Sequence, residues 1–178
     1  MEAELLKIMY APHSYMKQEY LAALPDVVLA TQSHSLSSQL IMEHYNLLRN
    51  VDFSFAPGPL LSAVIRGWQY IPRVAILLGC YLLRPPLIFS GIARRFDANC
   101  QAFMALPLGI SLPPQPLTAL TTETIQDTGA GALIATLENF SPALTQRARL
   151  MFSDLTAHKA FIIAPSTLIM AFDYAKIS

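Results

Sequence analysis

Prolines divide this chain into short segments, and their spacing limits what the chain can fold into. Thirteen prolines are spread over 178 residues, so one occurs about every 14 residues. Proline disrupts a helix interior and a central strand, but it is accepted in the first turn of a helix. Between the prolines, apolar residues recur at helical spacing, and no alternating run of β-branched residues ends in a hairpin turn. The sequence therefore predicts an all-α fold, a single compact domain over residues 1–178 with proline-delimited helices around a central apolar helix.

Apolar periodicity gives the expected helices: 5–10, 15–24, 35–49, 60–71, 73–83, 94–106, 143–158 and 167–175. Residues 74–83 are apolar on all sides, which is typical of a central core helix. Gly79 in this segment weakens a helix by about 1 kcal/mol relative to alanine, so we expect it to permit close packing by a neighbouring helix. We interpret Gly129-Ala-Gly131 as a helix start or turn, and 107–116 as a surface connector.

The apolar segments are too short to cross a membrane. A spanning helix needs about 20 mostly apolar residues. The uncharged run 98–122 contains four prolines, 74–83 ends at Arg84, and 160–172 is interrupted by Pro165. Residues 1–12 carry acids and no long apolar stretch, unlike a secretory signal. We therefore expect no transmembrane segment and a cytoplasmic location, and we leave peripheral attachment to a membrane open.

The scarcity of charge predicts exposed apolar surface. Charged residues make up 13% of the chain, about half of the roughly 25% usual in soluble domains, while 53% of the residues are hydrophobic. So few charges do not cover a domain of this size. An exposed apolar patch usually marks a surface that binds a partner or a membrane.

No grouping of residues indicates catalysis or a bound cofactor. The chain lacks a dinucleotide-binding glycine motif, a phosphate-binding loop and the His-Glu-x-x-His motif of zinc proteases. Cys80 and Cys100 lie in apolar, helix-like surroundings, so we expect buried, reduced thiols. Four histidines are scattered without a carboxylate at metal-ligand spacing: His13, His34, His44 and His158. We therefore expect no enzymatic activity, no cofactor and no metal; a site assembled from scattered residues is the enzymatic alternative.

The charges are balanced overall but unevenly distributed. Twelve acids offset twelve bases, yet no acid occurs between Asp52 and Asp97. Five arginines fall in that interval: Arg66, Arg73, Arg84, Arg94 and Arg95. They are either solvated side chains of a helical region or a basic face that meets an acidic partner.

Arg94 and Arg95 are the candidate partner-binding residues. The expected helix 94–106 places both at its start, where a positive charge is unfavourable to the helix dipole by about 0.3–1 kcal/mol. The pair therefore does not serve helix stability. Contact with an acidic partner surface is one reason for such a pair, and solubility in a charge-poor chain is the other.

Nucleic-acid binding is not expected. Arg66, Trp68, Tyr70 and Arg73 interleave basic and aromatic residues, a pattern that some nucleic-acid-binding proteins share. The chain has no net charge and no further basic stripe. We interpret Trp68 as a core residue flanked by solvated arginines.

Residues 66–84 contain Trp68, Pro72, Gly79, Cys80 and Arg84, and together with further segments of the chain they resemble the OrgA/MxiK/SctK family of type III secretion adaptors. Members of that family share a tryptophan, a proline four residues later, an apolar helix ending in a Leu-Gly-Cys-like step, and an arginine one turn further on. The matching residues here are Trp68, Pro72, Gly79, Cys80 and Arg84. Residues 8–15, with Tyr-Ala-Pro and a later tyrosine, are similar to the opening of the family, and residues 101–105, 109–112 and 168–175 are similar to its later segments.

The resemblance implies a cytoplasmic, non-enzymatic adaptor peripheral to the bacterial inner membrane. In such machines the adaptor links the cytoplasmic domain of the inner-membrane ring protein SctD to the pod protein SctQ. SctQ in turn carries SctL and the ATPase SctN, and the whole assembly is the sorting platform for protein export. The runner-up interpretation is a small helical protein-binding module or chaperone unrelated to secretion.

Overall fold

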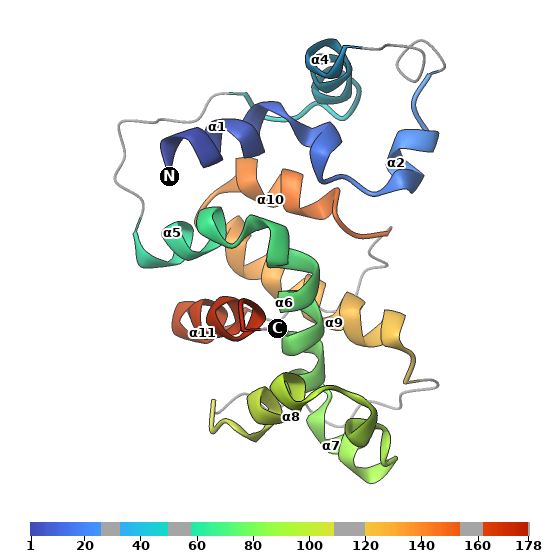
Figure 1. Ribbon diagram of the computed structural model, residues 1–178, viewed down its shortest axis with the longest axis vertical. Coiled ribbons are helices and arrows are strands. Elements are labelled where there is room, and N and C mark those ends of the chain that lie inside the picture. Colours follow the sequence, from blue (N-terminus) through green and yellow to red (C-terminus); the bar gives the residue numbers. More distant parts are fainter. Residues whose placement is uncertain (26–32, 50–57, 109–119, 154–161, 178) are drawn as a thin grey trace.

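The computed structural model describes residues 1–25, 33–49, 58–108, 120–153 and 162–177, and every regular element in these ranges is helical. Figure 1 shows α1, α2 and α4 at one end, α6 and α9 through the middle, and α7 and α8 at the opposite end. The elements are α1 (Glu2–Tyr10), η1 (Pro12–Ser14), α2 (Gln18–Ala22), α4 (His34–His44), α5 (Pro59–Arg66), η2 (Trp68–Tyr70), α6 (Ile71–Leu82), α7 (Arg84–Phe89), η3 (Ile92–Arg95), α8 (Ala98–Ala105), α9 (Thr122–Glu138), α10 (Pro142–Arg149) and α11 (Pro165–Ala175).

The expected all-α fold is confirmed, and prolines open several of its helices. Pro59, Pro72, Pro142 and Pro165 each lie in the first turn of a helix, where the missing N–H has no helical partner in any case. Ser141 caps α10 because its hydroxyl oxygen accepts a hydrogen bond from the amide of Leu144. Among the described residues, no helix is both long and apolar enough to cross a bilayer.

Helix α6 forms the centre of the main core, as its apolar sequence predicts. It packs against α9, α11 and α8, and in Figure 1 it runs along the long axis of the molecule. Nine of its 12 residues are buried, including Val74, Leu77 and Cys80. A helix buried on so many sides is stabilised by its neighbours rather than by its own propensity.

Gly79 and Gly129 face each other where α6 crosses α9. A Cβ atom on Gly79 would overlap the carbonyl oxygen of Ile125, and one on Gly129 would overlap the carbonyl oxygen of Ala75. The expected close packing at Gly79 is therefore confirmed. The interpretation of Gly129 as a helix start or turn is wrong, because Gly129 lies inside α9, where it allows the two backbones to approach.

Several expected helix boundaries are wrong. The helix expected at 35–49 ends at His44, because Asn46 takes a left-handed backbone conformation with φ of 48°. The segment expected at 60–71 is divided at Gly67, so Trp68 lies in η2 rather than in α5. The helix expected at 143–158 ends at Arg149. His158 and most of the expected connector lie outside the described residues.

A second, smaller cluster of apolar side chains lies at the N-terminal end. It is formed by Met16, Leu24, Ile41, Met42, Leu47 and Leu150. Leu150, just after α10, joins the cluster from the C-terminal half, and its carbonyl oxygen accepts a hydrogen bond of 2.8 Å from the amide of Lys17. This cluster and this hydrogen bond therefore join the N-terminal helices to the end of α10.

Arg147 on α10 also ties the N-terminus to the C-terminal half. Its side chain is fully buried, and its Nε and one terminal nitrogen donate to the carbonyl oxygen of Met9 at 3.1 and 2.8 Å. The other terminal nitrogen donates to the carbonyl oxygen of Ala143. Met9 lies in the last turn of α1, where carbonyl groups lack helical partners. Burial lowers the pKa of Arg147 from its ordinary value.

Arg147→Met is expected to lower the free energy of unfolding by about 1–3 kcal/mol, because the carbonyl of Met9 loses its donors while remaining buried. Methionine keeps most of the side-chain volume, so the change tests the hydrogen bonds rather than a cavity. Chemical denaturation of both proteins measures the difference. Arg149→Met is the control, since the Arg149 side chain is 59% exposed and pairs with Glu138. Equal effects of the two changes would contradict the role given to Arg147.

Candidate functional site

The most exposed large apolar side chains at the α7–α8 end belong to α7. Phe89 is 92% exposed and Ile88 is 60% exposed. Pro85 and Pro86 occupy the first turn of this short helix. The chain turns back at Gly91, whose φ of 72° is a left-handed conformation that glycine adopts readily, and η3 then packs against α7. This turn leaves Ile88 and Phe89 at a protruding corner.

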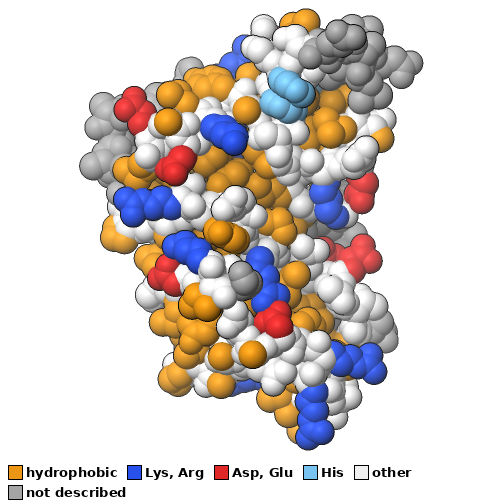
Figure 2. Space-filling model, in the orientation of Figure 1, with side chains coloured by type: hydrophobic (Ala, Val, Ile, Leu, Met, Phe, Trp, Pro, Cys, Tyr) orange, Lys and Arg blue, Asp and Glu red, His pale blue; other side chains and the backbone are white. Residues whose placement is uncertain are grey.

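Arg94 and Arg95 are both exposed and lie beside this corner in the last turn of η3. The expectation that they begin a helix 94–106 is wrong. Phe96 and Asp97 have extended backbone, and α8 begins only at Ala98. The helix-dipole argument therefore does not apply to the two arginines. We name Ile88, Phe89, Arg94 and Arg95 together the α7–η3 surface; Figure 2 shows basic side chains projecting beside hydrophobic ones at this end of the molecule.

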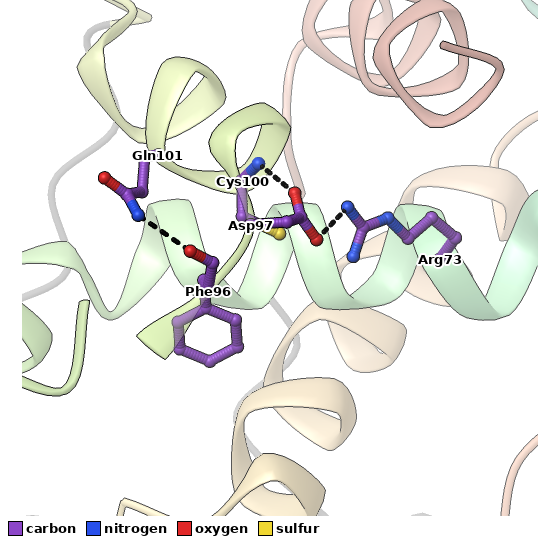
Figure 3. A network of polar contacts seen from close by, with 5 residues as sticks. All are labelled: Arg73, Phe96, Asp97, Cys100 and Gln101. Atoms are coloured by element: carbon purple, nitrogen blue, oxygen red, sulfur yellow. Dashed lines mark hydrogen bonds and ion pairs between the residues drawn. The ribbon is translucent and has the colours of Figure 1, made fainter. Parts of the chain in front are cut away.

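Asp97 holds the junction between η3 and α8 against the core (Figure 3). Its carboxylate caps α8 by accepting a 2.9 Å hydrogen bond from the amide of Cys100, and it also pairs with Arg73 on α6. The amide of Cys100 and the Arg73 guanidinium hold the pKa of Asp97 below its ordinary value. On the other side of the junction, the Gln101 side chain donates to the carbonyl oxygen of Phe96 at 2.7 Å. These contacts fix the position of the residues that follow η3.

The positive charges of the α7–η3 surface have no acidic partner within the described residues. Asp97 is the one acid in residues 58–108, and Arg73 already neutralises it. No ion pair links Arg94 or Arg95 to any described acid. Within the part of the chain that the structure describes, the charges of Arg94 and Arg95 are therefore not neutralised.

A groove of about 380 Å³ adjoins the α7–η3 surface. It is lined by Arg84, Ile88, Ala93, Arg94, Gln101, Met104 and Ala105. Arg84 is held in place at its rim, since it donates a 2.9 Å hydrogen bond to the carbonyl oxygen of Met104 and its guanidinium lies 5.2 Å from the centre of the Tyr81 ring. The groove is thus lined by apolar side chains, a glutamine and two arginines.

The other residues of the tryptophan-to-arginine segment have structural positions. Trp68 is buried and its ring meets that of Tyr15 edge to face, with centroids 5.4 Å apart. Pro72 opens α6, and Gly79 lies at the crossing with α9. Arg84 opens α7. Trp68 does not join Arg94 and Arg95 in a common site.

Cys80 and Cys100 are fully buried free thiols, as expected, and the fold brings them together. They come from α6 and α8, which pack against each other. The neighbouring Cys100 thiol and burial raise the pKa of Cys80. Their proximity was not expected from the sequence, in which 19 residues separate them.

The histidines of the described region do not gather with other metal-binding side chains. His13 and His34 stack with ring centroids 4.8 Å apart, and His13 shares a 2.6 Å hydrogen bond with Ser38. No group of three His, Cys, Asp or Glu residues within the described ranges could hold a metal ion. The stack packs η1 against α4.

An exposed aromatic corner, an apolar groove and two cations with no ion pair to a described acid are typical of a helical protein that binds other proteins. Comparison with known families gives the particular class. The chain belongs to the family described as bacterial type III secretion apparatus protein (OrgA_MxiK), whose model matches residues 5–177. The resemblance recognised in the sequence is therefore confirmed.

Curated relatives agree with this assignment. The chain is 28% identical over 172 residues to the oxygen-regulated invasion protein OrgA of Salmonella typhimurium strain LT2, and the match covers 96% of this chain and 85% of the relative. The proteins of the same name from strains SL1344 and 14028s match to the same extent. No solved structure gives a significant match.

Proposed function

We propose that this chain is a non-enzymatic adaptor of a bacterial type III secretion apparatus, and that it links the cytoplasmic domain of the ring protein SctD to the pod protein SctQ. Through SctQ it contacts SctL and the ATPase SctN indirectly. It acts as one domain on the cytoplasmic side of the inner membrane. The observation that carries the proposal is the family match over residues 5–177.

The α7–η3 surface is the part of the chain that we propose for one of these contacts. Protein interfaces combine exposed apolar side chains, which supply most of the affinity, with charges that select the partner. Phe89 and Ile88 supply the first, and Arg94 and Arg95 the second. All four residues are exposed, so they do little for the core.

A pull-down tests the adaptor function. The chain is immobilised, and retention of the purified SctQ-like protein and of the purified ring protein is measured. The adaptor should retain both components, and a chaperone or binding module unrelated to secretion should retain neither. Retention of only one would reject the linking role while leaving a role in the apparatus.

Charge reversal at Arg94→Glu with Arg95→Glu should weaken binding of one of these two partners at low salt, with little effect on folding. Exposed charges interact across about 10 Å at 0.1 M salt and over shorter distances as salt rises, so the loss should shrink at higher salt. Binding measured at several salt concentrations, together with thermal unfolding, provides the readout.

The matched control is Lys7→Glu with Arg66→Glu. These two residues are also exposed, they lie on α1 and α5 away from α7, and their reversal changes the net charge by the same amount. If the control weakens binding equally, overall charge is responsible. Unchanged low-salt binding of both partners by the Arg94 and Arg95 variant would remove the pair from either interface.

A further inference from the structure

We infer that the α7–η3 surface and its groove bind an acidic segment of a partner protein, with an apolar side chain of that segment in the groove beside Phe89. The inference rests on the proposed adaptor function for the identity of the partner protein. The chemistry of the bound segment is argued from the surface itself.

The apolar part of the surface is arranged to receive a side chain. Ile88, Ala93 and Met104 border the groove, whose volume of about 380 Å³ is enough for one or two large apolar side chains. Phe89 is 92% exposed at the end of α7 and packs against little of its own chain. Phe89 follows Ile88, which lines the groove, and exposed aromatic side chains are common anchors of protein interfaces.

The polar part of the surface requires negative charge in the partner. Arg84 and Arg94 line the groove, and Arg95 follows Arg94 in the chain. Arg84 is already hydrogen-bonded to the carbonyl of Met104, but its positive charge is not neutralised by a described acid. A segment carrying Asp or Glu next to its apolar residue would pair with these cations, and a basic segment would be repelled.

An acidic protein segment fits these observations better than a lipid surface does. Attraction to anionic lipids contributes about 1 kcal/mol per Lys or Arg near the membrane, and lipid-binding clusters carry about four to eight such residues. The α7–η3 surface has two exposed arginines. A flat bilayer surface would also leave the groove between α7 and α8 unfilled.

A photocrosslinker at position 89 tests the inference in the full chain. The variant Phe89→p-benzoylphenylalanine is expressed in a bacterium that carries the secretion apparatus, and the crosslinked peptides are identified by mass spectrometry. The expected product is one defined segment of another protein, with Asp or Glu flanking an apolar residue. A crosslink to a segment without acids, a crosslink to a second copy of this chain, or no protein crosslink would each overturn the inference.

The affinity of a synthetic peptide of the captured segment then gives the contribution of Phe89 to binding. Phe89→Ser is expected to weaken binding of this peptide about tenfold, because an aromatic anchor is worth a tenfold or larger factor. Phe140→Ser is the matched control; Phe140 is 47% exposed and lies between α9 and α10, far from α7. Equal affinities of Phe89→Ser and wild type would overturn the inference.

Three results separate this inference from the proposed function and from the lipid alternative. If wild type retains the ring and pod proteins, but Phe89→Ser binds the captured peptide as tightly as wild type does, the inference fails and the adaptor function stands. If the captured acidic segment belongs to neither protein, the inference stands and the proposed linking role fails at this surface. Co-sedimentation of wild type, but not of Phe89→Ser, with phosphatidylglycerol vesicles would overturn the inference in favour of a membrane.

Discussion

Gly129→Ala is expected to lower the free energy of unfolding by about 3 kcal/mol or more, at or beyond the upper end of the usual cost of overpacking. The added methyl group would meet the carbonyl of Ala75 and the amide nitrogen of Gly79, which belong to the backbone of α6. Backbone atoms do not rotate away as a side chain does, so α6 and α9 would have to separate. Urea denaturation and the melting temperature measure the change.

Gly131→Ala is the control, two residues away in the same helix. No heavy atom lies within 4 Å of a Cβ added there, apart from near neighbours in the helix. Alanine is a better helix former than glycine, so this variant is expected to be more stable than wild type by about 0.5–1 kcal/mol. The two substitutions thus have opposite expected signs, and similar effects of both would contradict the close approach of α6 and α9.

Trp68→Ala is expected to cost about 3–5 kcal/mol, a large share of the usual total stability of about 5–15 kcal/mol. Trp68 is 7% exposed and packs on Tyr15, and its indole Nε1 has no hydrogen-bond partner among the described residues. The loss is therefore one of packing. Trp68→Phe should cost less, because it keeps an aromatic ring and removes an N–H without a partner.

Partner binding by the folded fraction of Trp68→Ala shows whether Trp68 is a core residue or a surface contact. Binding should be unchanged once the folded fraction is corrected for, since Trp68 lies in the core and outside the α7–η3 surface. A Trp68→Ala protein that keeps its melting temperature and loses a partner would instead make Trp68 a surface contact.

The central helix could be predicted from the sequence because its signal is local. An apolar run that starts at a proline predicts a buried helix, and Gly79 within it predicts a close neighbour. The identity of that neighbour could not be predicted. Its closest-packed partner, α9, has a Thr-rich start and two glycines, which are weak helix formers, and tertiary packing against α6 outweighs that preference. The spacing of Ile125, Gly129 and Leu133 at four-residue intervals was the available signal.

The candidate site was only half predicted. Charge distribution singled out Arg94 and Arg95, but the periodicity through Phe96 joined them to the following helix. Asp97, a favoured helix cap followed by Ala98, was the signal for the break. Phe89 and Ile88 were missed because apolar side chains at a protruding turn look like core residues in a sequence. Their exposure depends on the reversal of the chain at Gly91.

The pairing of α6 with α9 has a consequence for synthesis of the chain on the ribosome. α6 ends at Leu82 and α9 at Glu138, 56 residues later. At a translation rate of about 5–20 residues per second, synthesis of α9 is completed about 3–11 s after synthesis of α6. For that time the most apolar helix exists without the partner that covers it, and Phe172 of α11 arrives later still. The nascent chain is therefore prone to associate with other chains until its last third has been made. A messenger RNA truncated before the codon for residue 138 would yield a fragment that aggregates.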